Sequence, residues 1–324
     1  MTHWDGPRAS VAHPGRDPHT FDSEHVVSHR TYMPAIERDI PTKDGRVLRT
    51  LEDGDPRGKP IFYLHGTPGS RLLHEAQVHE ARRLGVRLIA YDRPGYGGST
   101  PMRGRTVADA ARDIAAIADA LAIDRFAVMG HSGGGPHCLA CAATLPERVV
   151  AASSLASPAP YPAEGIDYFA GMGERNVEDI KLMMSDQAAW EAKSDEENAQ
   201  MRVATPQEVL AVLSSLLSDV DRAVLDDDLA GFLLRQMREG LRPGGIGPRD
   251  DSLAGFRTWG FEVSAVRVPL QLWHGGQDRF VPFSHGKWLA AHAPQAEAHL
   301  DPKGGHLTLV NQYPEIMEWL AARF

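Results

Sequence analysis

Short apolar runs alternate with segments of helical periodicity from about residue 34 to the end of the chain. Short runs rich in β-branched side chains are typical of strands that are buried on both faces. Strands that alternate with helices form right-handed βαβ units, so the sequence predicts an α/β fold with a mainly parallel sheet flanked by helices. The predicted strands are Ile61–Leu64, Val86–Tyr91, Phe126–Met129, Val149–Leu155 and Pro269–Trp273.

Several helix starts can be recognised from their capping residues. In the clearest helical segment, residues 107–123, apolar side chains recur along one stripe. Thr106 stands three residues before Asp109, which fits a capping box in which the threonine hydroxyl accepts a hydrogen bond from an amide of the first turn. A second capping box, with a proline in the first turn, is predicted at 205–208, and the last helix is predicted to begin at Tyr313 and Pro314.

The strand signals stop between residues 158 and 262, where the sequence is helical and acidic side chains outnumber basic ones. A strand series that is interrupted by a helical block and then resumes predicts an inserted cap. We therefore expect residues 34–157 and 263–324 to form the α/β core and residues 158–262 to form a helical cap, or lid. Residues 1–33 contain scattered histidines and no apolar periodicity, which predicts a disordered N-terminal arm.

The segment Gly130–Gly134 (GHSGG) follows a predicted strand and precedes a predicted helix. In this context G-x-S-x-G places a serine on a tight turn with its hydroxyl exposed at the end of the sheet, and the amide of Gly133 points to where an oxyanion would form. A serine nucleophile needs a base, which an acid orients in turn. Asp278 follows a predicted strand and His306 lies in a later glycine-rich turn. We therefore predict a catalytic triad of Ser132, His306 and Asp278.

Taken together, the motifs resemble the α/β-hydrolase superfamily, in its capped serine esterase and iminopeptidase-like branch. They occur in the order HGTPG at 65–69, DRPGYGGS at 92–99, GHSGG at 130–134, HGGQD at 274–278 and GH at 305–306. The resemblance implies that the backbone amide of Thr67 supplies the second oxyanion donor and that the DRPGYGGS segment has a structural role. Serine at position 132 differs from the aspartate of epoxide hydrolases, and Gly133 differs from the tryptophan that follows the nucleophile in proline iminopeptidases.

A cap that covers Ser132 would place the substrate pocket between the cap and the sheet. The apolar composition of the candidate wall predicts a pocket for medium-sized acyl or aromatic groups. The alternative is that the cap side chains form a small core of their own. The candidate wall residues are Pro68, His131, Phe169, Met172, Met184 and Phe232.

The function predicted from these residues is hydrolysis by acyl transfer, on a carboxylic ester, lactone or thioester with a medium-sized apolar group. Two alternatives remain open. The same triad could cleave an amide, a peptide or a carbon–carbon bond, or the protein could be a ligand-binding receptor that retains the triad but has negligible turnover. The expected partner is a small-molecule substrate, and the sequence specifies no oligomeric state.

Other function classes are disfavoured by charge and composition. The net charge is −9 and no Lys/Arg cluster stands out, so neither nucleic acid nor a membrane surface is an expected partner. No apolar stretch is long enough to span a membrane and no secretory signal stands out, which predicts a cytoplasmic location. No cofactor or metal is expected, because the only two cysteines, Cys138 and Cys141, lie one turn apart in an alanine-rich helix and are interpreted as core residues.

Overall fold

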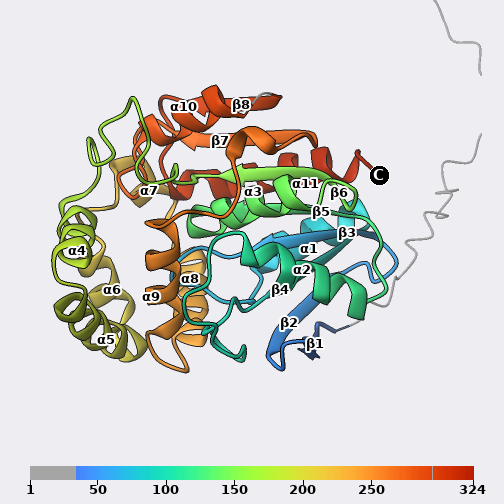
Figure 1. The fold of residues 1–324 in the computed structure, drawn as a ribbon, viewed down its shortest axis with the longest axis horizontal. Helices are drawn as coiled ribbons and strands as arrows, with labels where there is room; N and C mark the ends of the chain where they lie inside the picture. The colour runs from blue at the N-terminus through green and yellow to red at the C-terminus, as the bar shows by residue number, and fades with distance from the viewer. Residues whose placement is uncertain (1–33, 294) are drawn as a thin grey trace, which may run out of the picture. The chain divides into compact units, whose positions relative to one another are not determined.

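A computed structural model describes residues 34–293 and 295–324, so the predicted N-terminal arm, residues 1–33, lies outside the described residues. In the described part of the chain, eight strands form one sheet in the order β1-β2-β4-β3-β5-β6-β7-β8 (Figure 1). The strands are β1 (Ile36–Pro41), β2 (Val47–Gly54), β3 (Lys59–Leu64), β4 (Val86–Tyr91), β5 (Phe126–His131), β6 (Val149–Leu155), β7 (Leu270–Gly275) and β8 (Ala296–Asp301).

The prediction of a mainly parallel sheet is confirmed. β2 pairs antiparallel with β1 and β4, and the other neighbouring strands pair in parallel. All five predicted strands are present, and β4 and β6 have the predicted bounds. The hairpin of β1 and β2 was not among the predicted strands. Its edge strand β1 is largely exposed and carries charged side chains, as edge strands often do. The sequence of β1 therefore lacks the apolar run from which the five strands above were predicted.

Helices cover both faces of this sheet. α1 (Glu75–Leu84) and α11 (Tyr313–Ala321) pack on one face, while α2 (Asp109–Ala120), α3 (Gly135–Thr144) and α10 (Phe283–His292) pack on the other. Alternate residues of each central strand pack against the two helix layers, because successive side chains of a strand point to opposite faces. In β5, Phe126 and Val128 contact the layer of α2, α3 and α10, and Ala127 and Met129 contact the layer of α1 and α11.

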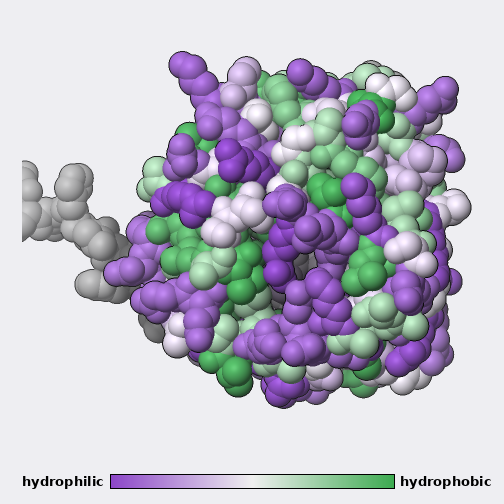
Figure 2. All heavy atoms as spheres, turned by 90° about the vertical axis from the view of Figure 1, so that its left-hand side faces the viewer, coloured by the Kyte–Doolittle hydropathy of each residue, from purple (hydrophilic) through white to green (hydrophobic). Residues whose placement is uncertain are grey.

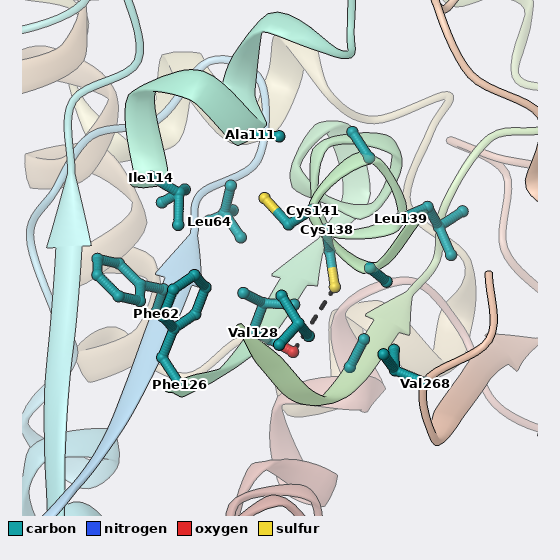
Figure 3. Close-up of a cluster of buried hydrophobic side chains, with 14 of the residues drawn as sticks. Phe62, Leu64, Ala111, Ile114, Phe126, Val128, Cys138, Leu139, Cys141 and Val268 are labelled. Atoms are coloured by element: carbon teal, nitrogen blue, oxygen red, sulfur yellow. Dashed lines mark hydrogen bonds between the residues drawn. The ribbon is translucent and has the colours of Figure 1, made fainter. Parts of the chain in front are cut away.

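Cys138 and Cys141 lie inside the layer between α3 and the sheet (Figure 3). Both are fully buried free thiols in the same apolar cluster as Phe62 and Val128. Burial raises the pKa of the Cys138 thiol to about 12, and its Sγ–H donates to the carbonyl oxygens of Ser153 at 3.4 Å and Val128 at 3.6 Å. A protonated thiol in such surroundings packs as a small apolar side chain, as the sequence analysis expected.

The predicted helix starts have different outcomes. At α6 (Pro206–Val212) the capping box is present, with the Glu208 amide donating to Thr205 Oγ1 and the Thr205 amide donating to Glu208 Oε2 at 2.7 Å. α11 begins at Tyr313, as predicted. At Thr106 only half of the predicted capping box is present. The Thr106 amide donates to Asp109 Oδ2 at 2.7 Å, but the Thr106 hydroxyl donates to the same oxygen at 3.0 Å and accepts from no amide of the described first turn. Residues 107 and 108 form a turn, and α2 begins only at Asp109.

Between β6 and β7 the described chain contains helices and no strand, and residues 158–262 are called the insertion below. Its helices lie together at one side of the sheet, on the left in Figure 1. Figure 2 shows that face, where hydrophilic side chains surround a hollow near the middle. The helices are α4 (Glu174–Ser185), α5 (Gln187–Val203), α6, α7 (Asp219–Val224), α8 (Asp227–Gly240) and α9 (Ile246–Gly255).

The two ends of the insertion are built into the core. Ala254 of α9 and Trp259 pack in the same cluster as α2, α3 and the strands, and Tyr168 packs near Trp288 of α10. Residues 158–262 are therefore packed against the α/β core at both ends. No helix of the residues described here is long and apolar enough to cross a membrane.

Candidate active site

Ser132 lies at the junction of β5 and α3. β5 ends at His131, and a short 3-10 turn, η1 (Ser132–Gly134), leads directly into α3. Ser132 has φ 56°, a left-handed conformation that is uncommon for a residue with a side chain and is typical of functional turns. A Cβ atom at Gly134 would lie 2.1 Å from the carbonyl oxygen of Leu64, so the turn is tight enough to require glycine there.

The loop after β3 lies beside this turn because β3 and β5 are parallel neighbours. A Cβ atom at Gly66 would lie 4.0 Å from Ser132 Oγ, and a Cβ atom at Gly133 would lie 2.3 Å from Thr67 Oγ1 and 3.2 Å from Thr67 N. The structure therefore brings Thr67 and Gly133, the two expected oxyanion donors, together next to Ser132.

Asp278 and His306 meet at the carboxyl ends of β7 and β8. His306 Nδ1 lies 2.7 Å from Asp278 Oδ2, and the amides of Phe280 and Val281 donate to Asp278 Oδ1 at 2.8 and 2.9 Å. Since an ionised carboxylate can only accept, Nδ1 of His306 carries the proton and Nε2 is the nitrogen that remains to take one.

The charged forms of His306 and Asp278 stabilise each other. Burial by itself lowers the pKa of His306, but the charge of Asp278, its hydrogen bond and the charge of Asp221 together raise that pKa above its ordinary value. Burial opposes ionisation of Asp278, yet His306 and the loop amides hold the pKa of Asp278 below its ordinary value. The arrangement therefore favours an aspartate anion next to a histidine that can hold a proton.

His131, the last residue of β5, forms a hydrogen bond with the main chain of His306. Its Nε2 donates to the carbonyl oxygen of His306 at 3.1 Å, so its Nδ1 accepts from the Tyr313 hydroxyl at 2.7 Å. Burial and the neighbouring His306 lower the pKa of His131 to about 3, which keeps it neutral. His131 is thus a fixed neutral donor, and His306 is the histidine placed to act as a base.

Ser132 and His306 line a cavity of about 490 Å³. One part of its wall comes from the core, including Thr67, His131 and Tyr313, and the other part comes from α6, α8 and the chain between them. Apart from Asp226, Asp228 and Gln236, the insertion side of the wall is aliphatic or aromatic. It includes Leu210, Leu213, Leu217, Leu229, Phe232 and Met237.

The charged groups of the cavity wall are acidic. Among the described lining residues none is Lys or Arg, whereas Glu80, Asp226 and Asp228 are present. Asp228 Oδ2 lies 3.0 Å from Nε2 of His74, another lining residue, and Glu80 pairs with Arg83 on α1. A ligand with a negative charge would therefore meet no fixed positive side chain on this wall.

Comparison with known proteins gives a family for this arrangement. The family model described as alpha/beta hydrolase fold matches residues 59–312, a range that contains Ser132, Asp278 and His306. The chain belongs to the α/β-hydrolase fold family.

Relatives of this hydrolase include two that match most of its length. The AB hydrolase superfamily protein YisY of Bacillus subtilis is 26% identical over 270 residues, which are 82% of this chain and 91% of the relative. A 2-hydroxy-6-oxononadienedioate/2-hydroxy-6-oxononatrienedioate hydrolase of Cupriavidus pinatubonensis is 26% identical over 284 residues, 83% of this chain and 88% of the relative. Among solved structures, a thermophilic esterase from Thermogutta terrifontis shares the fold, with a TM-score of 0.64 and 19% identity over 90% of this chain and 99% of that one.

The expected pocket wall of the hydrolase requires a correction. Pro68, His131 and Phe232 line the cavity, but Phe169, Met172 and Met184 do not, so the prediction was wrong for those three residues. Phe169 and Met172 pack against a small cluster that includes Tyr168, and Met184 is 50% exposed on α4. The insertion reaches the cavity through α6 and α8 and the chain between them, and α4 does not take part.

Sequence reasoning missed Asp251 of α9. This buried carboxylate lies 2.6 Å from Arg93 and 2.6 Å from Arg105, and it accepts from the Tyr96 hydroxyl at 2.6 Å and from Thr67 Oγ1 at 2.9 Å. Although burial alone would raise the pKa of Asp251, the two guanidinium groups hold it well below its ordinary value. Asp251 therefore connects the insertion to the residue expected to supply the second oxyanion donor.

Arg93 extends this connection to the main chain of the same loop. It donates to the carbonyl oxygens of His65 and Gly66, the latter at 3.1 Å, and to Thr67 Oγ1 at 3.0 Å. The structural role expected for the DRPGYGGS segment thus takes a definite form, since Arg93 holds the loop that carries the Thr67 amide. No motif marks Asp251, because it lies in a helical stretch whose partners are far away in the sequence.

Proposed function

We propose that this hydrolase acts by acyl transfer to Ser132 on a carboxylic ester, lactone or thioester that carries a medium-sized apolar group. The observation that carries this proposal is the 2.7 Å hydrogen bond between His306 and the buried Asp278, with His306 and Ser132 lining one cavity. A histidine oriented in this way through Nδ1 can take the proton of the serine hydroxyl through Nε2. The serine then becomes a competent nucleophile.

The reaction would follow two balanced stages. The Ser132 oxygen attacks the substrate carbonyl while His306 takes its proton, and the amides of Thr67 and Gly133 stabilise the negative oxygen. His306 gives the proton to the leaving alcohol or thiol as the acyl–oxygen or acyl–sulfur bond breaks, which leaves an acylated Ser132. Water then attacks this ester with His306 as base, and the carboxylic acid leaves with Ser132 restored.

The cavity supports an uncharged apolar substrate. Its volume of about 490 Å³ is within the ~300–1,000 Å³ range of small-molecule sites, and its insertion side is built mainly from leucines and other apolar side chains. The relative from Cupriavidus is named for dioates, which carry two carboxylates. Because the described lining residues include no Lys or Arg, this wall favours neutral esters over such dianions.

A substrate screen tests the proposal. Purified protein is assayed with p-nitrophenyl esters of increasing acyl length, lactones, thioesters, aminoacyl anilides and a dienedioate, with Ser132→Ala as the inactive control. We expect turnover of neutral esters and a stoichiometric fluorophosphonate adduct on Ser132. Cleavage of anilides or of the dienedioate alone would support the amide or carbon–carbon alternative. Saturable ligand binding with neither product nor adduct would support the receptor alternative.

A further inference from the structure

A second carboxylate lies against the loop that carries His306. Asp221, on α7 of the insertion, is fully buried. Its Oδ1 accepts from the Leu307 amide at 2.7 Å, and its Oδ2 accepts from Ser218 Oγ at 2.7 Å. Within the described part of the chain, no Lys or Arg forms an ion pair with Asp221. The residue directly after His306 is thus held by a buried carboxylate that no Lys or Arg of residues 34–293 and 295–324 neutralises.

The loop is shaped to let this carboxylate approach. A Cβ atom at Gly305 would lie 2.3 Å from Asp221 Oδ1 and 2.7 Å from Oδ2, so no other residue fits at that position without movement. The Gly305 amide in turn donates to Thr308 Oγ1 at 2.8 Å. The Thr308 hydroxyl donates to the Gly305 carbonyl oxygen at 3.2 Å. The peptide before His306 and the peptide after it are therefore both held by hydrogen bonds, and Asp221 lies against both Gly305 and Leu307.

The other ionisable groups around His306 come from three further segments. Asp278 is bonded to its ring, His131 of β5 lies with its ring centroid 5.1 Å away, and His274 of β7 lies 3.7 Å from Asp278. Burial lowers the pKa of both His131 and His274, so neither is expected to carry a charge near neutral pH. Asp221 is then the second carboxylate that raises the pKa of His306, after Asp278.

We propose that Asp221 is a positioning residue for the hydrolysis described above, which holds the His306 loop and stabilises the protonated form of His306. The inference rests on the proposed function, because a protonated His306 forms in each acyl transfer. Its physical basis is that a buried charge is weakly screened and acts strongly on its neighbours. Val224, the last residue of α7, lines the cavity, so one helix contacts both the substrate space and the loop that carries the base.

Asp221→Asn removes the negative charge of the side chain and keeps its size and shape nearly unchanged. Asparagine keeps an oxygen that can accept from the Leu307 amide but removes the negative charge. Asp219→Asn is the matched control, since Asp219 is exposed on the same helix. The ionisation of His306 is followed by NMR with ring-labelled histidine, and its signal is assigned with His306→Gln. This readout needs no turnover.

We expect the titration midpoint of His306 to fall by about half a pH unit to one unit in Asp221→Asn, because a nearby anion that favours the charged imidazole is lost. The acid limb of kcat/KM should move to lower pH by the same amount, and kcat on the plateau should fall several-fold with KM little changed. Asp219→Asn should match the wild type in all three respects.

An unchanged His306 midpoint in Asp221→Asn would overturn the inference, and so would a loss of thermal stability without any shift of the midpoint. Asp221→Ala should lower kcat further, because it also removes the hydrogen bond to the His306 loop. If that variant does not fold, the asparagine variant still tests the inference. A wild-type protein that neither hydrolyses esters nor labels at Ser132 would refute the proposed function. That result is separate from the NMR midpoint, which still supports or refutes the effect of Asp221 on His306.

Discussion

Asp251→Asn would remove a carboxylate that lies between two buried guanidinium groups. Arg93 and Arg105 each lie 2.6 Å from it, and all three side chains are at most 4% exposed. Breaking a buried ion pair by removing one partner typically costs about 3–5 kcal/mol, because the remaining charge is left uncompensated. Domains are stable by only about 5–15 kcal/mol, so this substitution should remove a large share of the free energy of unfolding.

The cost can be converted into a melting temperature. An unfolding entropy of ~2.1 cal/mol/K per residue, over about 290 residues, gives about 0.6 kcal/mol/K, so a loss of ~3–5 kcal/mol lowers Tm by about 5–8 °C. The Thr67 amide should also move, because Thr67 Oγ1 and Arg93 both bond to Asp251. We expect kcat to fall at least ~10-fold, approaching the ~10²–10³-fold loss that follows removal of an oxyanion donor.

Thermal unfolding and ester turnover of the purified variant measure both effects. Asp250→Asn is the control, because Asp250 is the adjacent carboxylate of α9 and its buried Oδ2 has no hydrogen-bond partner among the described residues. The control should keep its Tm within about 1 °C and its turnover near the wild-type rate, as a substitution without a buried pair normally does. A Tm loss below about 2 °C for Asp251→Asn, or equal losses in both variants, would refute this reasoning.

Three more predictions concern the site itself. Asp278→Asn should fold normally but lose about 10⁴-fold in kcat, because the imidazole then loses the carboxylate that orients it; near-normal turnover would mean that another group holds His306. The pKa of His306 is raised above its ordinary value, so a smaller share of His306 is neutral at a given pH. We therefore expect kcat/KM to fall with decreasing pH through a midpoint above about 6.5. A midpoint below that value would contradict this assignment. Phe232→Ala should reduce kcat/KM several-fold on long-chain esters and spare acetyl esters, because Phe232 belongs to the insertion side of the cavity wall, whereas Ser132 and His306 belong to the core. The exposed Met184→Ala should leave chain-length preference unchanged, and a shift there as large as that of Phe232→Ala would contradict the observed wall.

Local patterns in the sequence were sufficient for the fold class. The runs at β4 and β6 are mostly apolar and almost entirely buried, because parallel strands are covered by helices on both sides. Their bounds could therefore be predicted without any structure. The segment GHSGG could be placed between β5 and α3 because its glycines are required by contacts within a few residues of the chain or with the adjacent strand. Where the local pattern was weak, as in the exposed and charged β1, the prediction failed.

The insertion depended on long-range packing. The sequence of an amphipathic helix shows that it has an apolar face, but it does not show which surface that face contacts. Met184 and Phe232 therefore looked equivalent in the sequence. In the structure Met184 is half-exposed and Phe232 lines the cavity. The same reason hid Asp221 and Asp251 among the many acidic residues of the insertion. Their roles arise from partners that lie 86 and 158 residues away, Leu307 and Arg93, and only the tertiary fold brings those partners within hydrogen-bonding distance.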